Sequence, residues 1–559
     1  MGGYALERRE KKTISLYAAL LTMLAACLCV RALYGFCWSD ESFYLTFAQR
    51  LWNGQQLILD EWHPVQFYSA IFYPVLTAYR FFFGTEGIYL FSRILYVVLA
   101  WGVSLLVLLT FRKYTKAFPA FLCAGLVLSY SRANVWGLSY YNLFLLLIIT
   151  ALCLLLRGRG KRGLLLLSGL CLGFSVLCVP YFALFVLLAL GLALIKREYR
   201  HDALWVFGGI CAGAVYFLIF FLPKDPGGIL ANLSYILSDP EHSGGPFANL
   251  FNAISRLIVM FYWEVRIVLL GAVLLFLGDR FLPKAMGCLP GLLVLLTGAV
   301  LSLWRYRRGE TGFELYPFVL FMLPCTILLI LKKEQGLISL AMQVLGICMA
   351  VAMGLSSNTG AYAPIVGVVI YAMGVIVGSA AANNRSMRFF SSALSILVLV
   401  LILISRFHTV YRDAPLSQLD TAMTQGPAAG IHTTADHARQ YGELVSMLQE
   451  LEGEYGSDAP VFISKLMPWG YLALDNPCGA PTAWRTPVDS PRLSQYYESH
   501  PGSVPQIVVV LKPEVGDYDD VKTPNANTLE GWLWDYMEEQ QYTSVDYAYA
   551  QVYVSPLIG

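Results

Sequence analysis

The feature that most constrains the fold of this chain is a series of long apolar blocks between residue 14 and about residue 405. Each block is about as long as the roughly 20 residues that a helix needs to cross a bilayer. Of the 559 residues, 57% are hydrophobic and only 14% are charged, whereas soluble domains carry about 25% charged residues. The sequence therefore predicts a polytopic α-helical membrane protein.

Thirteen spans are expected, and the first is too long for the apolar core of a signal peptide. They lie near 14–36, 88–111, 117–131, 139–156, 163–179, 181–195, 203–222, 258–278, 285–304, 315–331, 337–355, 362–380 and 388–405. Loops rich in Lys and Arg alternate with loops that are poor in them, and the positive-inside rule places the rich loops in the cytoplasm. We therefore expect a multi-pass protein of the cell membrane, with a cytoplasmic N-terminus and an extracytoplasmic C-terminal part.

The composition changes near residue 406, where long apolar blocks give way to mixed sequence. Residues 434–456 carry apolar positions three and four apart, which is typical of an amphipathic helix. A second helix is expected within 528–541, and short segments with strand character lie at 459–466, 505–512 and 546–554. We expect a transmembrane domain over 1–405 and a small α/β domain over 406–559.

Two of the loops that this topology places outside are long, at 37–87 and 223–257. The first contains the aromatic segments SFYLTFAQRLWNG and VQFYSAIFYPVLTAYRFFFG, with few charges. Such segments predict short helices lying in the membrane interface, where Trp and Tyr rings are well accommodated. The second loop is rich in Pro and Gly and is expected to be mobile.

The overall charge and the cysteines exclude some classes of function. A net charge of +2, with basic clusters only at helix ends, gives no case for nucleic-acid binding. Of the 12 cysteines, only Cys37 and Cys478 fall in water-facing regions, and no metal-ligand spacing occurs. A disulfide between these two residues is a minor alternative to two free thiols.

The strongest candidates for chemistry are two acidic pairs in the first long loop. Asp40 and Glu41 follow the first span directly, and Asp60 and Glu61 come about 20 residues later, just before His63. Carboxylates at such a boundary often only cap a helix. Two acidic clusters joined by interfacial helices can instead face one cavity, where a partly desolvated carboxylate usually has a partner or a role. One such role is that of a general base that takes the proton of an attacking hydroxyl.

This loop resembles the first outer loop of the GT-C membrane glycosyltransferases. The most similar branch is that of protein O-mannosyltransferases and aminoarabinose transferases, which use polyprenyl-phosphate-linked sugars. The matching residues are Asp40 with Glu41, Gln49, Leu51, Asn53 with Gly54, Glu61, His63 with Pro64, Phe83 with Gly84, and Arg93. The resemblance covers mainly 36–95 and extends to the expected topology. It makes Asp40 the catalytic carboxylate and gives Glu61 and His63 contacts to the substrate, with Glu41 beside them.

A second group of candidates lies in LWRYRRGETGFELYPF, at 303–318. Arg305, Arg307 and Arg308 fall on the outer side, against the positive-inside trend. They could be snorkelling anchors at a helix end. Guanidinium groups also bind phosphate in bidentate fashion, and fixed cations stabilise the charge that grows on a leaving phosphate. We expect the second role, with Tyr316 adding a hydroxyl, and the choice among the three arginines stays open.

Other polar residues within the apolar part are weaker candidates. Arg93 lies inside a span and is as well suited to a structural pair as to a substrate contact. Arg132 is expected to be an interfacial anchor. Members of the resembled family often have an acid near the start of the fourth span, where this chain has Tyr140, Tyr141 and Asn142. The sequence therefore gives no support for a divalent metal, and no cofactor is expected.

These observations favour an enzyme that transfers a sugar from a polyprenyl-phosphate donor to a hydroxyl of a lipid, a cell-surface polymer or a protein. Inversion at the anomeric carbon is expected because one carboxylate activates the acceptor and no second nucleophile is evident. The main alternative is a transporter or lipid flippase, although the paired broken helices and inverted repeats of transporters are not evident. A scaffold whose outer domain binds a partner is a third alternative, and it leaves the acidic and arginine clusters unexplained.

Overall fold

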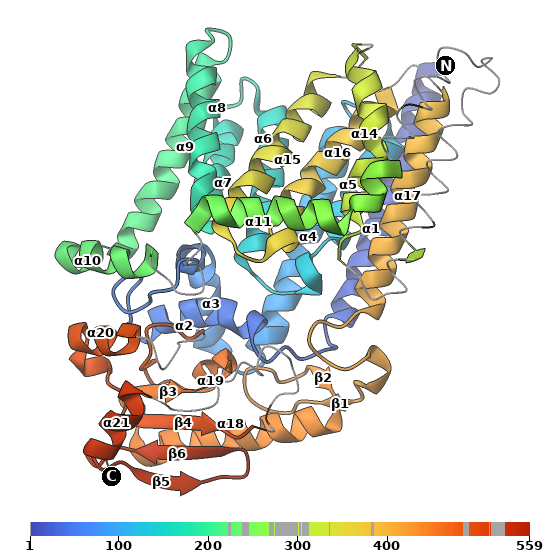
Figure 1. Cartoon of the computed structure of the whole chain (residues 1–559). Coiled ribbons are helices and arrows are strands. Elements are labelled where there is room, and N and C mark those ends of the chain that lie inside the picture. Colours follow the sequence, from blue (N-terminus) through green and yellow to red (C-terminus); the bar gives the residue numbers. More distant parts are fainter. Residues whose placement is uncertain are drawn as a thin grey trace.

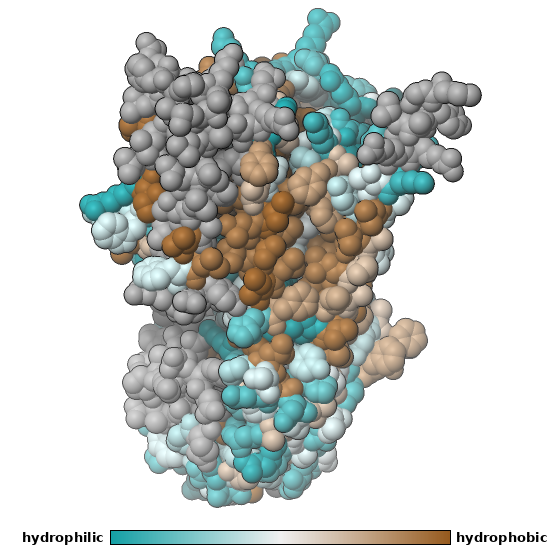
Figure 2. Space-filling view, turned by 90° about the vertical axis from the view of Figure 1, so that its right-hand side faces the viewer, coloured by the Kyte–Doolittle hydropathy of each residue, from teal (hydrophilic) through white to brown (hydrophobic). Residues whose placement is uncertain are grey.

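The computed structural model combines a bundle of apolar helices with a smaller C-terminal α/β region at one end of the bundle (Figure 1). It describes residues 2–221, 225–237, 245–267, 273, 300, 303–304, 312–331, 333–334, 336–381, 385–464, 466–484, 491–513, 515 and 531–558. Figure 2 shows an apolar belt over the bundle and a hydrophilic surface over the C-terminal region. The expected fold class, a polytopic helical protein with a C-terminal α/β part, is confirmed.

The helices of the bundle coincide with the expected spans wherever these are described. They are α1 (Gly2–Arg31), α4 (Ile88–Phe111), α5 (Ala117–Ser129), α6 (Tyr140–Gly158), α7 (Arg162–Cys178), α8 (Ala183–Ile195), α9 (Arg200–Leu218), α14 (Leu315–Leu331), α15 (Leu337–Ser356), α16 (Ile365–Ala381) and α17 (Arg385–His408). Six of the described helices are long and apolar enough to cross a membrane on their own. The expected spans at 258–278 and 285–304 lie largely outside the described residues.

Small residues allow the closest helix contacts in the bundle. A Cβ atom added at Gly169 of α7 would lie 2.0 Å from the carbonyl oxygen of Val206 on α9. The same holds between α15 and α16, where a Cβ at Gly367 would lie 2.3 Å from the carbonyl oxygen of Gly346. Helices in lipid gain stability from such close backbone packing, since burial from water contributes little there. These glycines therefore fix the spacing of two helix pairs.

The first long loop folds as expected, into α2 (Asp40–Trp52) and α3 (Ser69–Phe83). Figure 1 shows both helices between the bundle and the C-terminal region. All residues of α2 from Glu41 to Arg50 are buried, so this helix is covered from both sides. The interfacial position leaves the N-terminus of α2, with Asp40, at the junction of the two parts.

The second long loop, which was expected to be mobile, contains two helices where it is described. They are α10 (Pro226–Leu237) and α11 (Gly245–Met260), of which α11 runs across the bundle and α10 lies beside its lower end (Figure 1). Proline is favoured at the first position of a helix because its missing N–H is not needed there. The Asp225 carboxylate accepts hydrogen bonds of 3.0 Å from the amides of Gly227 and Gly228, which caps α10. The Pro and Gly residues of this loop thus begin helices instead of preventing them.

The C-terminal region contains a four-stranded sheet in the order β3-β4-β6-β5. Its strands are β3 (Val461–Ile463), β4 (Ile507–Leu511), β6 (Ala550–Val554) and β5 (Thr543–Asp546), with β3 and β4 parallel and the other pairs antiparallel. The expected helices are α18 (Ala435–Tyr455), capped by Thr434, and α21 (Trp532–Glu539). Strand β5 was not expected, because it is an exposed edge strand without apolar alternation.

Smaller elements complete the C-terminal region. They are the pair β1 (Thr421–Ala422) and β2 (His432–Thr433), with α19 (Pro468–Leu472) and α20 (Pro491–Ser499). The backbones of this region and of the loops of the bundle are directly joined. Gly35 N donates to the carbonyl of His432 at 2.9 Å, and Trp62 N donates to the carbonyl of Pro481 at 2.7 Å. These bonds hold the C-terminal region against the loops that follow α1 and α2.

Cys37 and Cys478, between which a disulfide was a minor alternative, are both free buried thiols. Burial raises the pKa of the Cys37 thiol to about 11, with further contributions from the Asp40 and Glu41 carboxylates. Burial also raises the pKa of Cys478. Both side chains therefore behave as small buried groups at neutral pH.

Candidate active site

A cavity of about 460 Å³ lies between the bundle and the C-terminal region. Its wall comes from α2, from the turn between α5 and α6, from the loop after α15, and from the segment that follows α17. The C-terminal region adds Trp484. Its titratable and charged lining side chains include Asp40, His63, Arg132, Glu314, Arg406 and Arg412.

Asp40, the first residue of α2, has two oxygens in different environments. Its Oδ2 atom accepts a hydrogen bond of 2.8 Å from the Tyr411 hydroxyl and lies 2.5 Å from Nη1 of Arg412. Its Oδ1 atom has no hydrogen-bond partner among the described residues. The side chain is 20% exposed. One oxygen is thus fixed, and the other is available to a molecule in the cavity.

Tyr411 acts as a hydrogen-bond donor toward this carboxylate. Burial raises the pKa of Tyr411 well above its ordinary value, and the neighbouring Asp40 carboxylate raises it further. The same two causes, in the same order, raise the pKa of Tyr44 on α2. Both hydroxyls therefore remain protonated at neutral pH, and that of Tyr411 donates to Asp40.

Arg132 projects into the cavity from the turn between α5 and α6. Its Nε donates to the carbonyl of Tyr362 at 3.1 Å, and its Nη2 donates to Oγ1 of Thr359 at 2.9 Å. Its guanidinium carbon lies 3.6 Å from the centre of the Tyr141 ring. Across the ranges that the structure describes, Arg132 has neutral partners and no carboxylate.

Arg406, near the end of α17, is a second cation without a described carboxylate partner. Its Nη1 donates to Oδ1 of Asn134, and its guanidinium carbon lies 3.6 Å from the centre of the Trp136 ring. The residue is only 3% exposed, and its Nε atom has no hydrogen-bond partner among the described residues. Burying a cation without a counter-charge is costly. Arg132 and Arg406 thus give the cavity lining two cations that have no carboxylate partner among the described residues.

Aromatic rings form much of the remaining wall. Phe43 lies 4.6 Å from Trp484 and 4.8 Å from His63, measured between ring centres. Tyr140 and Tyr141 stand where members of the resembled family often have an acid, and their ring centres lie 3.9 Å apart with the ring planes tilted by 31°. An aromatic wall with a few convergent polar groups is typical of a site for a small molecule or part of a larger substrate.

Glu41 and Arg93, both expected near the donor, form a buried pair outside the cavity lining. Arg93 Nε lies 2.5 Å from Oε1 of Glu41, and its Nη2 donates to Oε2 at 2.6 Å. Arg93 also donates to the carbonyls of Ala32 and Gly35, at 2.8 and 2.7 Å. Each side chain is 3% exposed. This geometry gives the pair a structural role, joining α2 and α4 to the end of α1.

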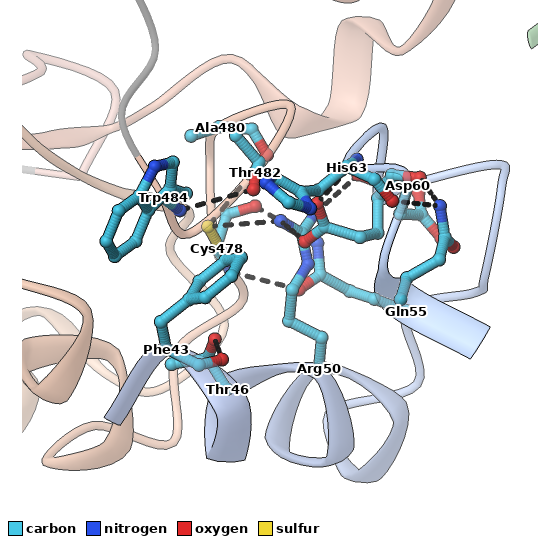
Figure 3. A network of polar contacts seen from close by, with 12 residues as sticks. Phe43, Thr46, Arg50, Gln55, Asp60, His63, Cys478, Ala480, Thr482 and Trp484 are labelled. Carbon is cyan, nitrogen blue, oxygen red and sulfur yellow. Dashed lines mark hydrogen bonds and ion pairs between the residues drawn. The ribbon is translucent and has the colours of Figure 1, made fainter. Parts of the chain in front are cut away.

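Glu61 and His63 take different positions although they are two residues apart. Glu61 is buried, and its Oε2 lies 2.9 Å from Nη1 of Arg50, which in turn donates to the sulfur of Cys478. Its Oε1 accepts a bond of 3.0 Å from the backbone amide of His63. Figure 3 shows this network joining α2 to the C-terminal region. Only His63 lines the cavity, so Glu61 holds the loop that presents it.

The second group of expected residues is only partly described. Arg305, Arg307 and Arg308 lie outside the described residues. Tyr316 is buried, donates its hydroxyl to the carbonyl of Ala361 at 2.6 Å, and does not line the cavity. The expected contact of Tyr316 with a phosphate therefore has no geometric support.

Glu314, from the same segment as Tyr316, lines the cavity as a second carboxylate. Its Oε1 accepts a bond of 3.0 Å from the amide of Gly312, and burial raises the pKa of Glu314. Glu314 was not among the candidates that the sequence analysis singled out. The sequence nevertheless carried a signal for Glu314. This residue stands directly before an apolar span, as Asp40 stands shortly after one.

The sequence analysis also missed the arginines that line the cavity together with Asp40. Arg132 was assigned to the interface, and Arg406, Tyr411 and Arg412 were not singled out. The last three stand in SRFHTVYRD, where two arginines end an apolar block on the side poor in basic residues. That is the same departure from the positive-inside trend that drew attention to Arg307.

No group of three or more His, Cys, Asp or Glu side chains is placed to hold a metal ion within the part of the chain that the structure describes. The cavity lining instead pairs isolated carboxylates with arginines and hydroxyls.

Comparisons with known proteins give likeness to solved structures only. No family model matches the chain, and no curated protein matches it. ArnT from Cupriavidus metallidurans matches in the apo state, with 12% identity, 98% of this chain and 99% of that chain covered, and a TM-score of 0.40. The same enzyme bound to undecaprenyl phosphate matches with 13% identity, 97% and 98% coverage, and a TM-score of 0.41.

An oligosaccharyltransferase from Archaeoglobus fulgidus matches with 14% identity, 96% of this chain and 73% of that chain covered, and a TM-score of 0.33. At these identities and TM-scores, the function of this chain has to be argued from its own residues.

Proposed function

We propose that the chain is a membrane glycosyltransferase that moves a sugar from a polyprenyl-phosphate donor to a hydroxyl acceptor. One observation carries this proposal. Asp40, with one oxygen available, lines the same cavity as Arg132 and Arg406, which have no carboxylate partner among the described residues. A base and an anion site side by side are what this reaction requires.

The proposed step is a single displacement. The acceptor hydroxyl gives its proton to Oδ1 of Asp40 while its oxygen forms a bond to the anomeric carbon of the sugar. The bond between that carbon and the phosphate oxygen breaks, and the phosphate leaves with the electron pair. Arg132 and Arg406 stabilise the charge that grows on the leaving phosphate. A single displacement inverts the configuration of the anomeric carbon.

The second carboxylate does not compete for the role of base in this proposal. Burial raises the pKa of Glu314 and so disfavours its charged form, whereas Oδ2 of Asp40 lies 2.5 Å from Nη1 of Arg412. The Glu314 carboxyl is suited to a hydrogen bond with a sugar or phosphate oxygen. We therefore assign the proton transfer to Asp40 and a binding role to Glu314.

The wider setting of the site belongs to the same proposal. Arg305, Arg307 and Arg308 precede Gly312 and Glu314, which line the cavity, so these arginines would add phosphate contacts. The cavity and the α/β part, taken as a domain over 406–559, would face outside, with the N-terminus in the cytoplasm. The acceptor would be a lipid, a cell-surface polymer or a protein.

The test uses the full-length protein and begins with the leaving group, which does not depend on the identity of the sugar. We expect wild type and Asp40→Asn to bind a synthetic polyprenyl phosphate equally, and Arg132→Gln with Arg406→Gln to lose binding. A panel of polyprenyl-phosphate sugars then measures transfer, expected for wild type and absent for Asp40→Asn. Equal binding by the double arginine variant, or undiminished transfer by Asp40→Asn, would overturn the proposal.

A further inference from the structure

The segment between α17 and the C-terminal region, residues 409–413 or TVYRD, forms a strap along the cavity. Thr409, Val410, Tyr411 and Arg412 all line the cavity. Tyr411 and Arg412 are also the only described side chains that hydrogen-bond or ion-pair with the Asp40 carboxylate. The orientation of Asp40 therefore depends on the position of this strap.

The first end of the strap, at Thr409, is held by one residue of α1 and by one residue of the turn between α5 and α6. The carbonyl oxygen of Thr409 accepts a bond of 2.9 Å from Nη2 of Arg31, at the end of α1. It also accepts a bond from Nδ2 of Asn134, in the turn between α5 and α6. Asn134 in turn holds Arg406, so the anion site and the start of the strap share one anchor.

The other end is fixed by Asp413, whose side chain is fully buried. Its Oδ2 accepts bonds of 2.6 Å from the amide of Phe36 and 2.8 Å from the hydroxyl of Thr433. Its Oδ1 lies 2.8 Å from the amide of Ala414 and 3.0 Å from Nδ1 of His437 on α18. Both oxygens are thus engaged, and they tie the strap to the C-terminal region and to the loop that precedes Asp40.

Two backbone features show that the path of the strap is specified between these anchors. Arg412 has a φ of 50°, in the left-handed region that side chains rarely adopt. Gly35 has a φ of 95°, and a Cβ added there would lie 2.5 Å from Cγ1 of Val410. Only glycine leaves room for the strap at this point. The left-handed turn at Arg412 lets two consecutive residues reach the same carboxylate oxygen.

We propose that the strap is a positioning device through which the C-terminal region holds the catalytic carboxylate. Asp413 and His437 anchor the strap, and Tyr411 and Arg412 orient Asp40 so that Oδ1 meets the acceptor hydroxyl. The inference rests on the function proposed above. It makes the C-terminal region part of the catalytic unit, because the chemistry depends on bonds made by Asp413 outside the cavity.

The decisive variant is Asp413→Asn, measured in the full-length protein. It weakens the anchor without removing any group that lines the cavity. A misplacement of about 1 Å can lower a rate about 100-fold, so we expect kcat to fall by that order. The KM for the donor and the Kd for a synthetic polyprenyl phosphate should stay unchanged, because Arg132 and Arg406 are intact. Asp436→Asn, an exposed residue of the same region, is the matched control and should have wild-type kcat.

A second variant keeps the proposal testable if Asp413→Asn does not fold. Tyr411→Phe removes one hydrogen bond to Asp40 and keeps the ring, and we expect kcat to fall about 10-fold with an unchanged KM. Wild-type kcat in Tyr411→Phe overturns the proposal, as does a folded Asp413→Asn that has wild-type kcat or loses kcat and donor affinity together. These outcomes require active wild type and inactive Asp40→Asn, whereas failure of that pair counts against the proposed function itself.

Discussion

Asp40 and Glu41 are neighbours in the sequence, and each lies 2.5 Å from an arginine, yet their surroundings differ. Asp40 and Arg412 are 20% and 26% exposed at the cavity, while Glu41 and Arg93 are each 3% exposed inside the protein. Consecutive residues of a helix point about 100° apart. At the start of α2, this rotation directs one carboxylate to the cavity and the other to the bundle.

The two pairs also differ in how completely each carboxylate is used. Arg93 engages both oxygens of Glu41 and two backbone carbonyls as well. Asp40 keeps one oxygen without a described partner. A saturated buried pair resists exchange and stabilises the fold, whereas an unsaturated carboxylate beside a cavity can accept a proton from a substrate. Two ion pairs of the same length are therefore suited to different roles, the Glu41–Arg93 pair to stabilising the fold and the Asp40 carboxylate to contact with a substrate.

The largest effect is expected when the carboxylate on the cavity side, Asp40, is replaced. Asp40→Asn keeps the shape of the side chain but removes the proposed base, so we expect kcat to fall by about 10²- to 10⁴-fold. The melting temperature of the purified protein should change little, because the side chain lies at a cavity. Sugar transfer and thermal unfolding are measured on the same preparation. A variant that is active, or one that is inactive only because it is unfolded, contradicts the assignment.

For the buried pair we expect the reverse, a loss of thermal stability with donor binding retained. Glu41→Gln leaves the Arg93 guanidinium buried without its carboxylate, which typically costs about 3–5 kcal/mol. We expect a large drop in thermal stability, and residual folded protein should bind the synthetic polyprenyl phosphate as wild type does. The double variant Glu41→Gln with Arg93→Met removes the unpaired charge and should recover part of the stability. A single variant as stable as wild type argues against a structural role.

The sequence predicted the helices that carry these two pairs better than the roles of the individual side chains. The spans, the two interfacial helices and the first acidic pair follow from hydropathy and from position along the chain. The assignment of Glu41 and Arg93 to the donor was not supported, because the partner of a charge inside a bundle depends on helix rotation. Local patterning does not encode that rotation.

The cations of the cavity were hard to predict for a related reason. Arg132 and Arg412 are almost 300 residues apart, and each alone looks like an anchor at the end of a span. Only the packed bundle brings both of them to the lining of one cavity. The role of the strap could not be predicted either, since it depends on contacts of Asp413 with Phe36 and His437 that are distant in sequence.

A third experiment asks whether the cavity side needs Arg132, which has no carboxylate partner among the described residues. Arg132→Gln keeps hydrogen-bond donors but removes the charge that we propose to stabilise the leaving phosphate. Removing one such group typically costs about 10²- to 10³-fold in kcat, and donor affinity should fall as well. Arg159→Gln is a suitable control, because Arg159 forms an exposed pair with Glu198. Equal loss of activity in both variants would show a general effect of charge instead of a specific one.

A smaller effect is expected for Trp484, which the C-terminal region contributes to the cavity. Its ring lies 4.6 Å from that of Phe43, on the same helix as Asp40. An aromatic contact is worth about 0.5–1.5 kcal/mol beyond its buried area, so Trp484→Ala should raise the KM for donor or acceptor up to about 10-fold. Trp484→Phe should restore most of this loss. If Phe and Ala variants behave alike, the ring does not contact the substrate.

The smallest expected effect uses Cys37 as a reporter placed between the two pairs. Its pKa of about 11 reflects burial first and then the charges of Asp40 and Glu41, with Asp40 the larger contribution. At pH 8 only about one thiol in a thousand would be ionised. Labelling by a thiol reagent should therefore be slow at pH 8 and should rise as the pH approaches 11.

Removing either negative charge lowers the pKa of Cys37, because the thiolate is then repelled less. We expect faster labelling at a given pH in Asp40→Asn than in Glu41→Gln, each measured in a background where the other cysteines are replaced and compared with Cys37→Ser. The opposite order, with the protein shown to be folded, would mean that the Glu41 charge acts on this thiol more strongly than its pairing with Arg93 allows. Glu41 could then no longer be described as neutralised by Arg93, in contrast to the accessible Asp40.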